Sequence, residues 1–142
     1  MPTSFRMTIA TMLFGCMLAA AKLTVAQETP PFAASFDCLK AASPIENLIC
    51  SDEKLANLDR EMMALFTAMR NAIGNEEARQ GQLQEQRAWL KARLTTCKVP
   101  SSGKLPDDTS AMRACLTDEL HKRNSVLSEA IKKKPSRETV EA

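Results

Sequence analysis

The sequence predicts an all-α fold, a small disulfide-stapled helical bundle of two short helices followed by three longer ones. Apolar residues recur at three- and four-residue steps over long stretches, which is the spacing of one helix face. Strand-like alternation does not compete with this pattern. Four cysteines lie among these stretches. An even number of cysteines in a small exported domain indicates disulfides.

Residues 1–26 have the composition of an export signal. Arg6 supplies a basic start, an almost wholly apolar run follows, and small residues end at Ala26. Lys22 interrupts the run before it reaches the roughly 20 apolar residues of a membrane-spanning helix. We therefore expect a signal peptide over 1–26 and a periplasmic or secreted product. In the alternative, Cys16 is the acylated cysteine of a lipoprotein and anchors the chain to a membrane.

The remaining chain is long enough for one domain, because a hydrophobic core needs most of that length. We expect a flexible leader over 27–34, where two prolines adjoin. The helical domain is expected over 35–131 and a polar C-terminal tail over 132–142.

The two short helices are predicted from their start signals. Ser35 can cap a helix that runs to Ala42. The run from Ser43 to Glu46 combines a capping serine, a proline at the first helical position and a glutamate that can reach back to the serine amide. It predicts a second short helix that ends at Cys50.

The three long helices are predicted from their apolar stripes. Ser51 is expected to cap the first, whose stripe runs from Leu55 to Ile73. The second covers 76–97, and the third covers 110–133 after a loop rich in proline and glycine. Their inward positions are Leu83, Leu90 and Leu94 in the second, and Met112, Leu116, Leu120, Leu127 and Ile131 in the third.

Four cysteines allow three connectivities. The first two are symmetric about Pro44 and the last two about Pro106, so turns at these prolines bring each pair together. The predicted pairs are Cys38 with Cys50 and Cys97 with Cys115. A zinc site is the competing use, but its cysteines are usually close in sequence, as in C-x₂-C. We therefore expect no metal.

The charge of the chain argues against a nucleic-acid partner. Removal of 1–26 takes away two of the 19 basic residues and no acid, which leaves 17 against 17. A nucleic-acid binder needs a basic surplus. The charge is uneven, because 37–77 holds eight acids and four bases, whereas 79–98 holds five bases and one acid. This asymmetry suggests helices that pair through opposite charges.

Four signatures follow one another along the chain. They are the run from Phe36 to Cys50, the run from Leu55 to Met62, the run from Gln86 to Arg93 ahead of Cys97, and Cys115-Leu116 with Arg123. Together they resemble the LprI-type lysozyme inhibitor family over about 36–127. The resemblance implies an exported, disulfide-bonded helical domain and, for at least the named member of the family, inhibition of lysozyme. We expect no cofactor.

Arg87, Trp89 and Arg93 are candidate partner-binding residues. A tryptophan often anchors an interface. Arginines can present their guanidinium groups to the acid pair of a muramidase cleft. In the alternative, Trp89 belongs to the core, and the two arginines form internal ion pairs with Asp59 and Glu61 on the acidic partner helix.

Ser101, Ser102 and Gly103 are the other candidates. Their loop is tied at both ends if Cys97 pairs with Cys115, so it loses little entropy on entering a cleft. The alternative is a plain connector.

The sequence does not predict an enzyme. The only histidine, His121, has no nucleophile or orienting partner in its pattern. We expect a protein that blocks a lysozyme cleft by binding, or alternatively a non-inhibitory module that binds a cell-wall or host partner.

Overall fold

The computed structural model describes residues 32–133 and is helical throughout its regular elements. They are a 3-10 helix, η1 (Cys38–Lys40), and the helices α1 (Pro44–Cys50), α2 (Glu53–Ala72), α3 (Glu76–Thr96) and α4 (Ser110–Lys133). The predicted all-α fold is confirmed, with η1 in place of the first short helix. The expected signal peptide, most of the leader and nearly all of the tail lie outside the described residues.

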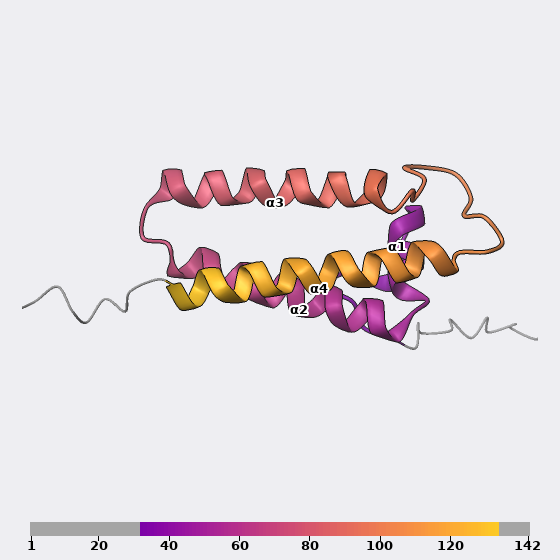
Figure 1. Cartoon of the computed structure of the whole chain (residues 1–142), viewed down its shortest axis with the longest axis horizontal. Helices are drawn as coiled ribbons and strands as arrows, with labels where there is room; N and C mark the ends of the chain where they lie inside the picture. Colours follow the sequence, from indigo (N-terminus) through magenta and orange to yellow (C-terminus); the bar gives the residue numbers. More distant parts are fainter. Residues whose placement is uncertain (1–31, 134–142) are drawn as a thin grey trace, which may run out of the picture.

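The three long helices run along the same axis (Figure 1). α2 and α4 point in the same direction and pack directly against each other. α3 runs antiparallel to both, on one side of the pair. α1 lies at the end where α3 leads into the loop to α4.

The core lies between α2 and α4 and extends to α1. Its fully buried side chains come from all three helices and are Leu48, Ile49, Leu55, Met62, Leu116, Leu120 and Leu127. The inward positions expected for the third long helix are therefore correct at Leu116, Leu120 and Leu127. Those expected for α3, Leu83, Leu90 and Leu94, are half-buried and pack against the edge of this core.

The start of α1 is the predicted capping box. The Ser43 side chain accepts a hydrogen bond from the Glu46 amide, and the Glu46 carboxylate accepts from the amides of Ala42 and Ser43 at 3.0 and 2.9 Å. Hydrogen bonds from these amides and from the Ser43 hydroxyl lower the pKa of Glu46.

Ser35 and Ser51 are not the helix caps that we expected. Asp37 caps η1, and the hydroxyl of Ser35 donates to Asp59 instead. Asp52 caps α2, accepting from the Leu55 amide at 3.0 Å. Ser51 donates its hydroxyl to backbone carbonyls of α1. Both corrections arise because an aspartate nearby accepts the amide hydrogen bond, which frees the serine for another partner.

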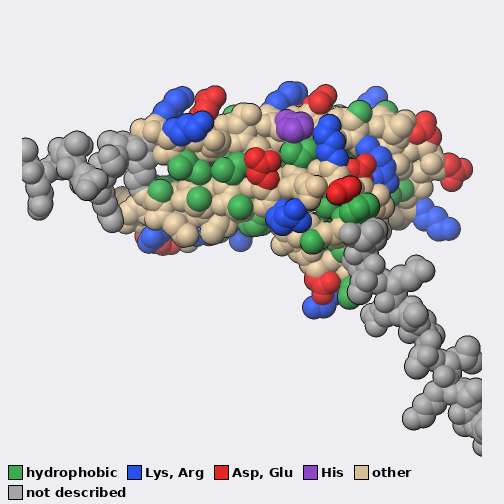
Figure 2. Space-filling view, turned by 90° about the horizontal axis from the view of Figure 1, so that it is seen from below, with side chains coloured by type: hydrophobic (Ala, Val, Ile, Leu, Met, Phe, Trp, Pro, Cys, Tyr) green, Lys and Arg blue, Asp and Glu red, His purple; other side chains and the backbone are tan. Residues whose placement is uncertain are grey.

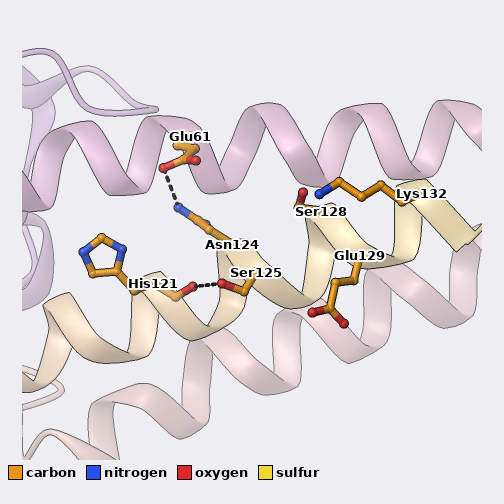
Figure 3. Close-up of a pocket in the computed structure, with 7 residues that line it drawn as sticks. All are labelled: Glu61, His121, Asn124, Ser125, Ser128, Glu129 and Lys132. Carbon is orange, nitrogen blue, oxygen red and sulfur yellow. Dashed lines mark hydrogen bonds between the residues drawn. The ribbon is translucent and has the colours of Figure 1, made fainter.

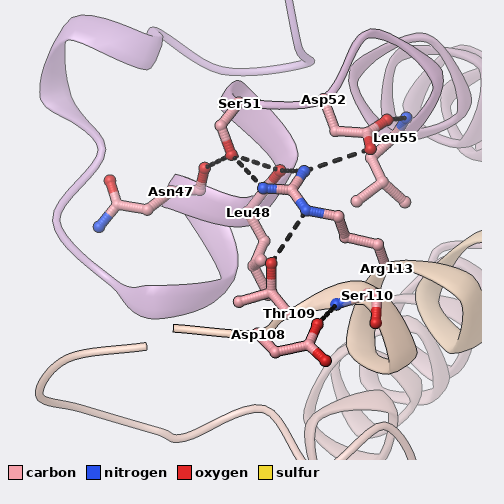
Figure 4. A network of polar contacts seen from close by, with 9 residues as sticks. All are labelled: Asn47, Leu48, Ser51, Asp52, Leu55, Asp108, Thr109, Ser110 and Arg113. Carbon is pink, nitrogen blue, oxygen red and sulfur yellow. Dashed lines mark hydrogen bonds and ion pairs between the residues drawn. The ribbon is translucent and has the colours of Figure 1, made fainter. Parts of the chain in front are cut away.

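Arg113 joins the ends of three helices in one polar network (Figure 4). Its guanidinium donates to the carbonyl oxygen of Leu48 in α1 at 3.3 Å. It also donates to the Ser51 hydroxyl at 2.9 Å and to the carboxylate of Asp52 at 3.2 Å. The first turn of α4 is thereby fixed to the junction of α1 and α2.

The two expected disulfides are present. Cys38 is bonded to Cys50 with a Cα–Cα distance of 5.7 Å, and Cys97 to Cys115 with 5.4 Å. Because each sulfur is bonded to another sulfur, these cysteines are not zinc ligands. The first bridge holds η1 against α1, and the second closes the loop between α3 and α4 at its base.

The end of α3 has a left-handed residue that is not glycine. Lys98 has φ 55°, its amide donates to Thr95, and the Val99 amide donates to Leu94 at 2.9 Å. These two bonds form a Schellman motif, in which glycine normally occupies the left-handed position.

Lys98→Gly is therefore expected to stabilise the protein. A side chain in the left-handed region costs about 1 kcal/mol, part of which the greater freedom of unfolded glycine offsets. The expected gain in the free energy of unfolding is a few tenths to about 1 kcal/mol. Urea unfolding measures it, and Lys98→Ala, which keeps the strain, is the control. Equal stability of the two variants would contradict the expectation.

Candidate functional site

α3 is joined to the rest of the bundle by a buried polar network. Arg123 of α4 donates from Nε and Nη2 to the amide oxygen of Gln86 at 2.9 and 2.6 Å. The amide nitrogen of Gln86 lies 2.8 Å from the sulfur of Met62 in α2. Gln86 and Arg123 are both buried. Long polar side chains therefore fill the space that apolar residues fill elsewhere.

Trp89 extends this network. It is half-buried and packs against the core. The guanidinium carbons of Arg93 and Arg123 lie over its ring, 5.2 and 5.5 Å from the centroid. Cation–π contacts of this kind contribute about 0.5–2 kcal/mol each. Trp89 therefore contributes to the packing of the fold, and only its exposed part is available to contact a partner.

Arg93 is buried beside Asp59. Its side chain is 8% exposed, that of Asp59 is 3% exposed, and Nη1 lies 4.0 Å from the carboxylate. Burial lowers the pKa of Arg93, and the charge of Asp59 opposes this effect. The amide and the hydroxyl of Ser35 both donate to Asp59. The structure therefore places Arg93 inside the molecule, where it forms the internal ion pair considered as an alternative.

Arg87 and Glu61 do not form the second internal pair of that alternative. Arg87 is exposed on α3 and makes no ion pair within residues 32–133. Glu61 accepts a hydrogen bond from the buried amide nitrogen of Asn124 at 3.0 Å. Of the three candidates on α3, Arg93 is buried, Trp89 is half-buried and Arg87 is exposed, so Arg87 is the one available to a partner.

The candidate loop residues lie at an exposed tip. Ser101, Ser102 and Gly103 are exposed, and Gly103 has φ 84°, which favours glycine. Val99 before the tip is 5% exposed and belongs to the core, while Leu105 after it packs against the core. The tip is therefore held on both sides by apolar anchors as well as by the Cys97–Cys115 bridge.

A groove lies beside this loop. It has a volume of about 410 Å³, and its lining comes from the last turns of α3 and the first loop residues, including Lys91, Lys98 and Ser101. The exposed loop tip and these two lysines form one continuous stretch of surface with the groove. We call this stretch, together with Arg87 one turn earlier on α3, the loop surface.

His121 lies at a different place, in a polar groove between α2 and α4 (Figure 3). The groove has a volume of about 310 Å³ and also contains Glu61, Asn124 and Ser125. The Ser125 hydroxyl donates to the backbone carbonyl of His121 at 3.0 Å. This serine is therefore occupied by the helix backbone instead of the imidazole, an arrangement different from a nucleophile and its base.

Hydrophobic side chains are also visible on the surface. Figure 2 shows a line of them along the molecule, on the side away from α3. A separate apolar groove of about 250 Å³ lies where α2 and α4 end, lined mainly by Met69, Ile73 and Ile131. Among residues 32–133, no helix is both long and apolar enough to cross a membrane.

A family model described as lysozyme inhibitor LprI matches residues 38–127. The chain belongs to this family. The match begins at the first disulfide cysteine and extends beyond the polar network to Leu127, so it includes both disulfides, the network and the loop surface. Comparison with curated proteins and with solved structures found no match. Membership in an inhibitor family is consistent with a protein that acts by binding.

Sequence reasoning missed the burial of Gln86, Arg123 and Asn124. A signal for the first of these was present. Cys97 must face the core to reach its disulfide partner, and steps of three or four residues back along α3 lead from Cys97 to Gln86, either through Leu94 and Leu90 or through Arg93 and Trp89. The face that carries the cysteine is therefore partly polar, although hydropathy alone assigns only the leucines to the inside.

Proposed function

We propose that this protein is an exported inhibitor of lysozyme that binds across the muramidase cleft through its loop surface. Family membership supports lysozyme as the target class. The observation that carries the choice of surface is the loop tip at 101–103, which is exposed, anchored on both sides and closed at its base by Cys97–Cys115. A loop held in this way binds without a large loss of conformational entropy.

The basic side chains of the loop surface suit the chemistry of the target. Muramidases cleave between two carboxyl groups in their cleft. Arg87 is exposed and Lys91 and Lys98 line the groove beside the loop, so they can donate charge-assisted hydrogen bonds to those carboxylates. Trp89 and the buried Arg93 support α3 from behind in this proposal, which replaces their expected role as direct anchors.

Export is part of the same proposal. Two disulfides are stable in an oxidising compartment such as the periplasm or the extracellular space. Lysozyme also acts on the cell wall, outside the cytoplasm. The expected cleavage after Ala26 would release a soluble protein into that compartment, and acylation of Cys16 would instead hold it at a membrane. The mass of the product purified from cells distinguishes the two.

The direct test is a titration of residues 27–142 against lysozyme on cell-wall substrate. Dose-dependent loss of lysis is expected, with saturation when inhibitor and enzyme are equimolar if binding is tight. The protein reduced and alkylated in denaturant is the control for nonspecific effects. Unchanged lysis by every lysozyme class tested would refute the proposed function.

Charge reversal tests the loop surface. Arg87→Glu together with Lys91→Glu is expected to weaken inhibition by about 100-fold or more, because two charge-assisted hydrogen bonds of about 1.5 kcal/mol or more each are lost. Neither residue is buried, so the melting temperature should not change. The inhibition constant is measured in the lysis assay.

The matched control is Lys132→Glu together with Lys122→Glu. These lysines are exposed on α4, outside the residues that define the loop surface, and the change in net charge is the same. If both double variants weaken inhibition equally, the effect is one of long-range charge, and the proposed surface is wrong.

A second candidate function is a non-inhibitory module that binds a cell-wall or host protein. The apolar groove at the ends of α2 and α4 favours it, because apolar surface of this kind is common at protein interfaces. The same titration decides between the candidates, since such a module would leave lysis unchanged.

A further inference from the structure

A cavity lies where the segment that precedes η1 (32–37, the N-terminal segment) meets α1, α2 and α3. The proposed inhibitory surface does not use this part of the molecule. Its volume is about 280 Å³. The apolar part of its lining includes Phe36, Ile45, Ile49, Met62, Met63 and Leu90. Ligand pockets are commonly about 300–1,000 Å³ and mainly apolar with a few polar groups. The cavity therefore suits a small ligand with an apolar body.

Some polar groups of the cavity lining have hydrogen-bond partners, and others do not. The Asp59 carboxylate accepts two hydrogen bonds from Ser35, and the Glu46 carboxylate accepts from Ala42 and Ser43. In contrast, Nε and Nη1 of Arg93 are buried and have no hydrogen-bond partner within residues 32–133. A buried donor without an acceptor costs about 1–3 kcal/mol, and more when it is charged. The cavity thus has acceptors that are occupied and donors that are not.

The unpaired donors determine which head group the ligand needs. The unpaired donors require an acceptor oxygen. The three charged groups of the lining are one guanidinium and two carboxylates, so a ligand carboxylate would meet a net negative charge. A neutral oxygen satisfies the donors without this repulsion.

We propose that the cavity binds a small acyl compound with a neutral carbonyl head group, such as an amide or an ester. Nε and Nη1 of Arg93 have almost no accessible surface in the unliganded cavity, so the Arg93 side chain turns toward the ligand when the carbonyl oxygen accepts its hydrogen bonds. The acyl chain lies among the methionine, leucine and isoleucine side chains of the lining. Because Arg93 lies over Trp89, the only tryptophan in the chain, binding changes the fluorescence of that residue.

The experiment uses octanamide as the probe, with octanoate and octyltrimethylammonium as probes that share its chain length but differ in charge. Methyl NMR of residues 27–142 monitors Ile45, Met62 and Met63 in the cavity, and Val126 on the exposed side of α4 is the control. Octanamide is expected to shift the cavity methyl signals saturably and to leave Val126 unchanged. Tighter binding of octanoate than of octanamide would overturn the neutral head group, and absence of saturable shifts with octanamide would overturn the site.

Arg93→Lys tests the hydrogen bonds. It keeps a positive charge beside Asp59 but removes the planar fork of donors. Octanamide is expected to bind this variant about tenfold more weakly or worse, whereas Lys98→Ala, outside the cavity, should bind it normally. If Arg93→Lys does not fold, the wild-type methyl titration still decides the proposal. Equal octanamide affinity in a folded Arg93→Lys variant would overturn the role of the guanidinium.

Discussion

Asp59→Ala is expected to lower the free energy of unfolding by about 3–5 kcal/mol, because it leaves the buried charge of Arg93 without its partner. Both side chains of the pair are buried, that of Asp59 being 3% exposed and that of Arg93 8% exposed. The variant also removes the acceptor of the two hydrogen bonds from Ser35, which connect the N-terminal segment to α2. Urea unfolding followed by circular dichroism measures the loss.

Two further variants separate the ion pair from other effects of losing an aspartate. Asp118 is exposed on α4 and makes no ion pair within residues 32–133, so Asp118→Ala should change stability by no more than about 0.5 kcal/mol. Asp59→Leu combined with Arg93→Met should be more stable than Asp59→Leu alone, because it removes the unpaired buried charge. If Asp59→Ala is as stable as Asp118→Ala, the internal ion pair does not contribute to the fold.

The helices could be predicted because their signals are local. The capping box at Ser43 and Glu46 needs only four consecutive residues, and the structure contains it. The apolar stripes of α2 and α4 likewise depend on spacing within one helix. The disulfide pairs followed from the symmetry of the cysteines about two prolines, which is also a property of short segments.

The caps of η1 and α2 could not be decided in this way. Ser35 and Asp37 can both cap a helix, as can Ser51 and Asp52. The structure selects the aspartates. Ser35 donates to Asp59, and Ser51, which donates to nearby carbonyls of α1, accepts from the distant Arg113. The choice therefore depends on tertiary contacts that a single segment does not reveal.

The buried polar face of α3 was missed for a related reason. Hydropathy assigns Gln86, Arg93 and Arg123 to the surface, because an unpaired polar group is costly to bury. Gln86 and Arg123 are buried together and satisfy each other, which requires residues 37 positions apart to meet. Of the candidate partner-binding residues chosen from the sequence, Arg87 and the loop tip at 101–103 are exposed, whereas Arg93 lies inside.

Removal of the Cys97–Cys115 disulfide by replacing both cysteines with serine is expected to lower both stability and inhibition. The two cysteines of this bridge are 18 positions apart in the sequence. Its loss costs about 3 kcal/mol in the loop-entropy model. For a domain of this size, that corresponds to a fall of more than about 10 °C in the melting temperature. Thermal unfolding followed by circular dichroism measures this part of the effect.

The inhibitory part of the effect follows from the position of this bridge at the base of the loop surface. Without it, the tip at 101–103 is more mobile and must be ordered when it binds, so inhibition should weaken even at temperatures where the variant is folded. The matched control replaces Cys38 and Cys50 with serine, since that bridge closes a separation of 12 and lies in η1 and α1. It should lose comparable stability and keep its inhibition. Equal inhibition constants for the two folded variants would mean that the loop is only a connector, and that the cleft-binding surface lies elsewhere on the molecule.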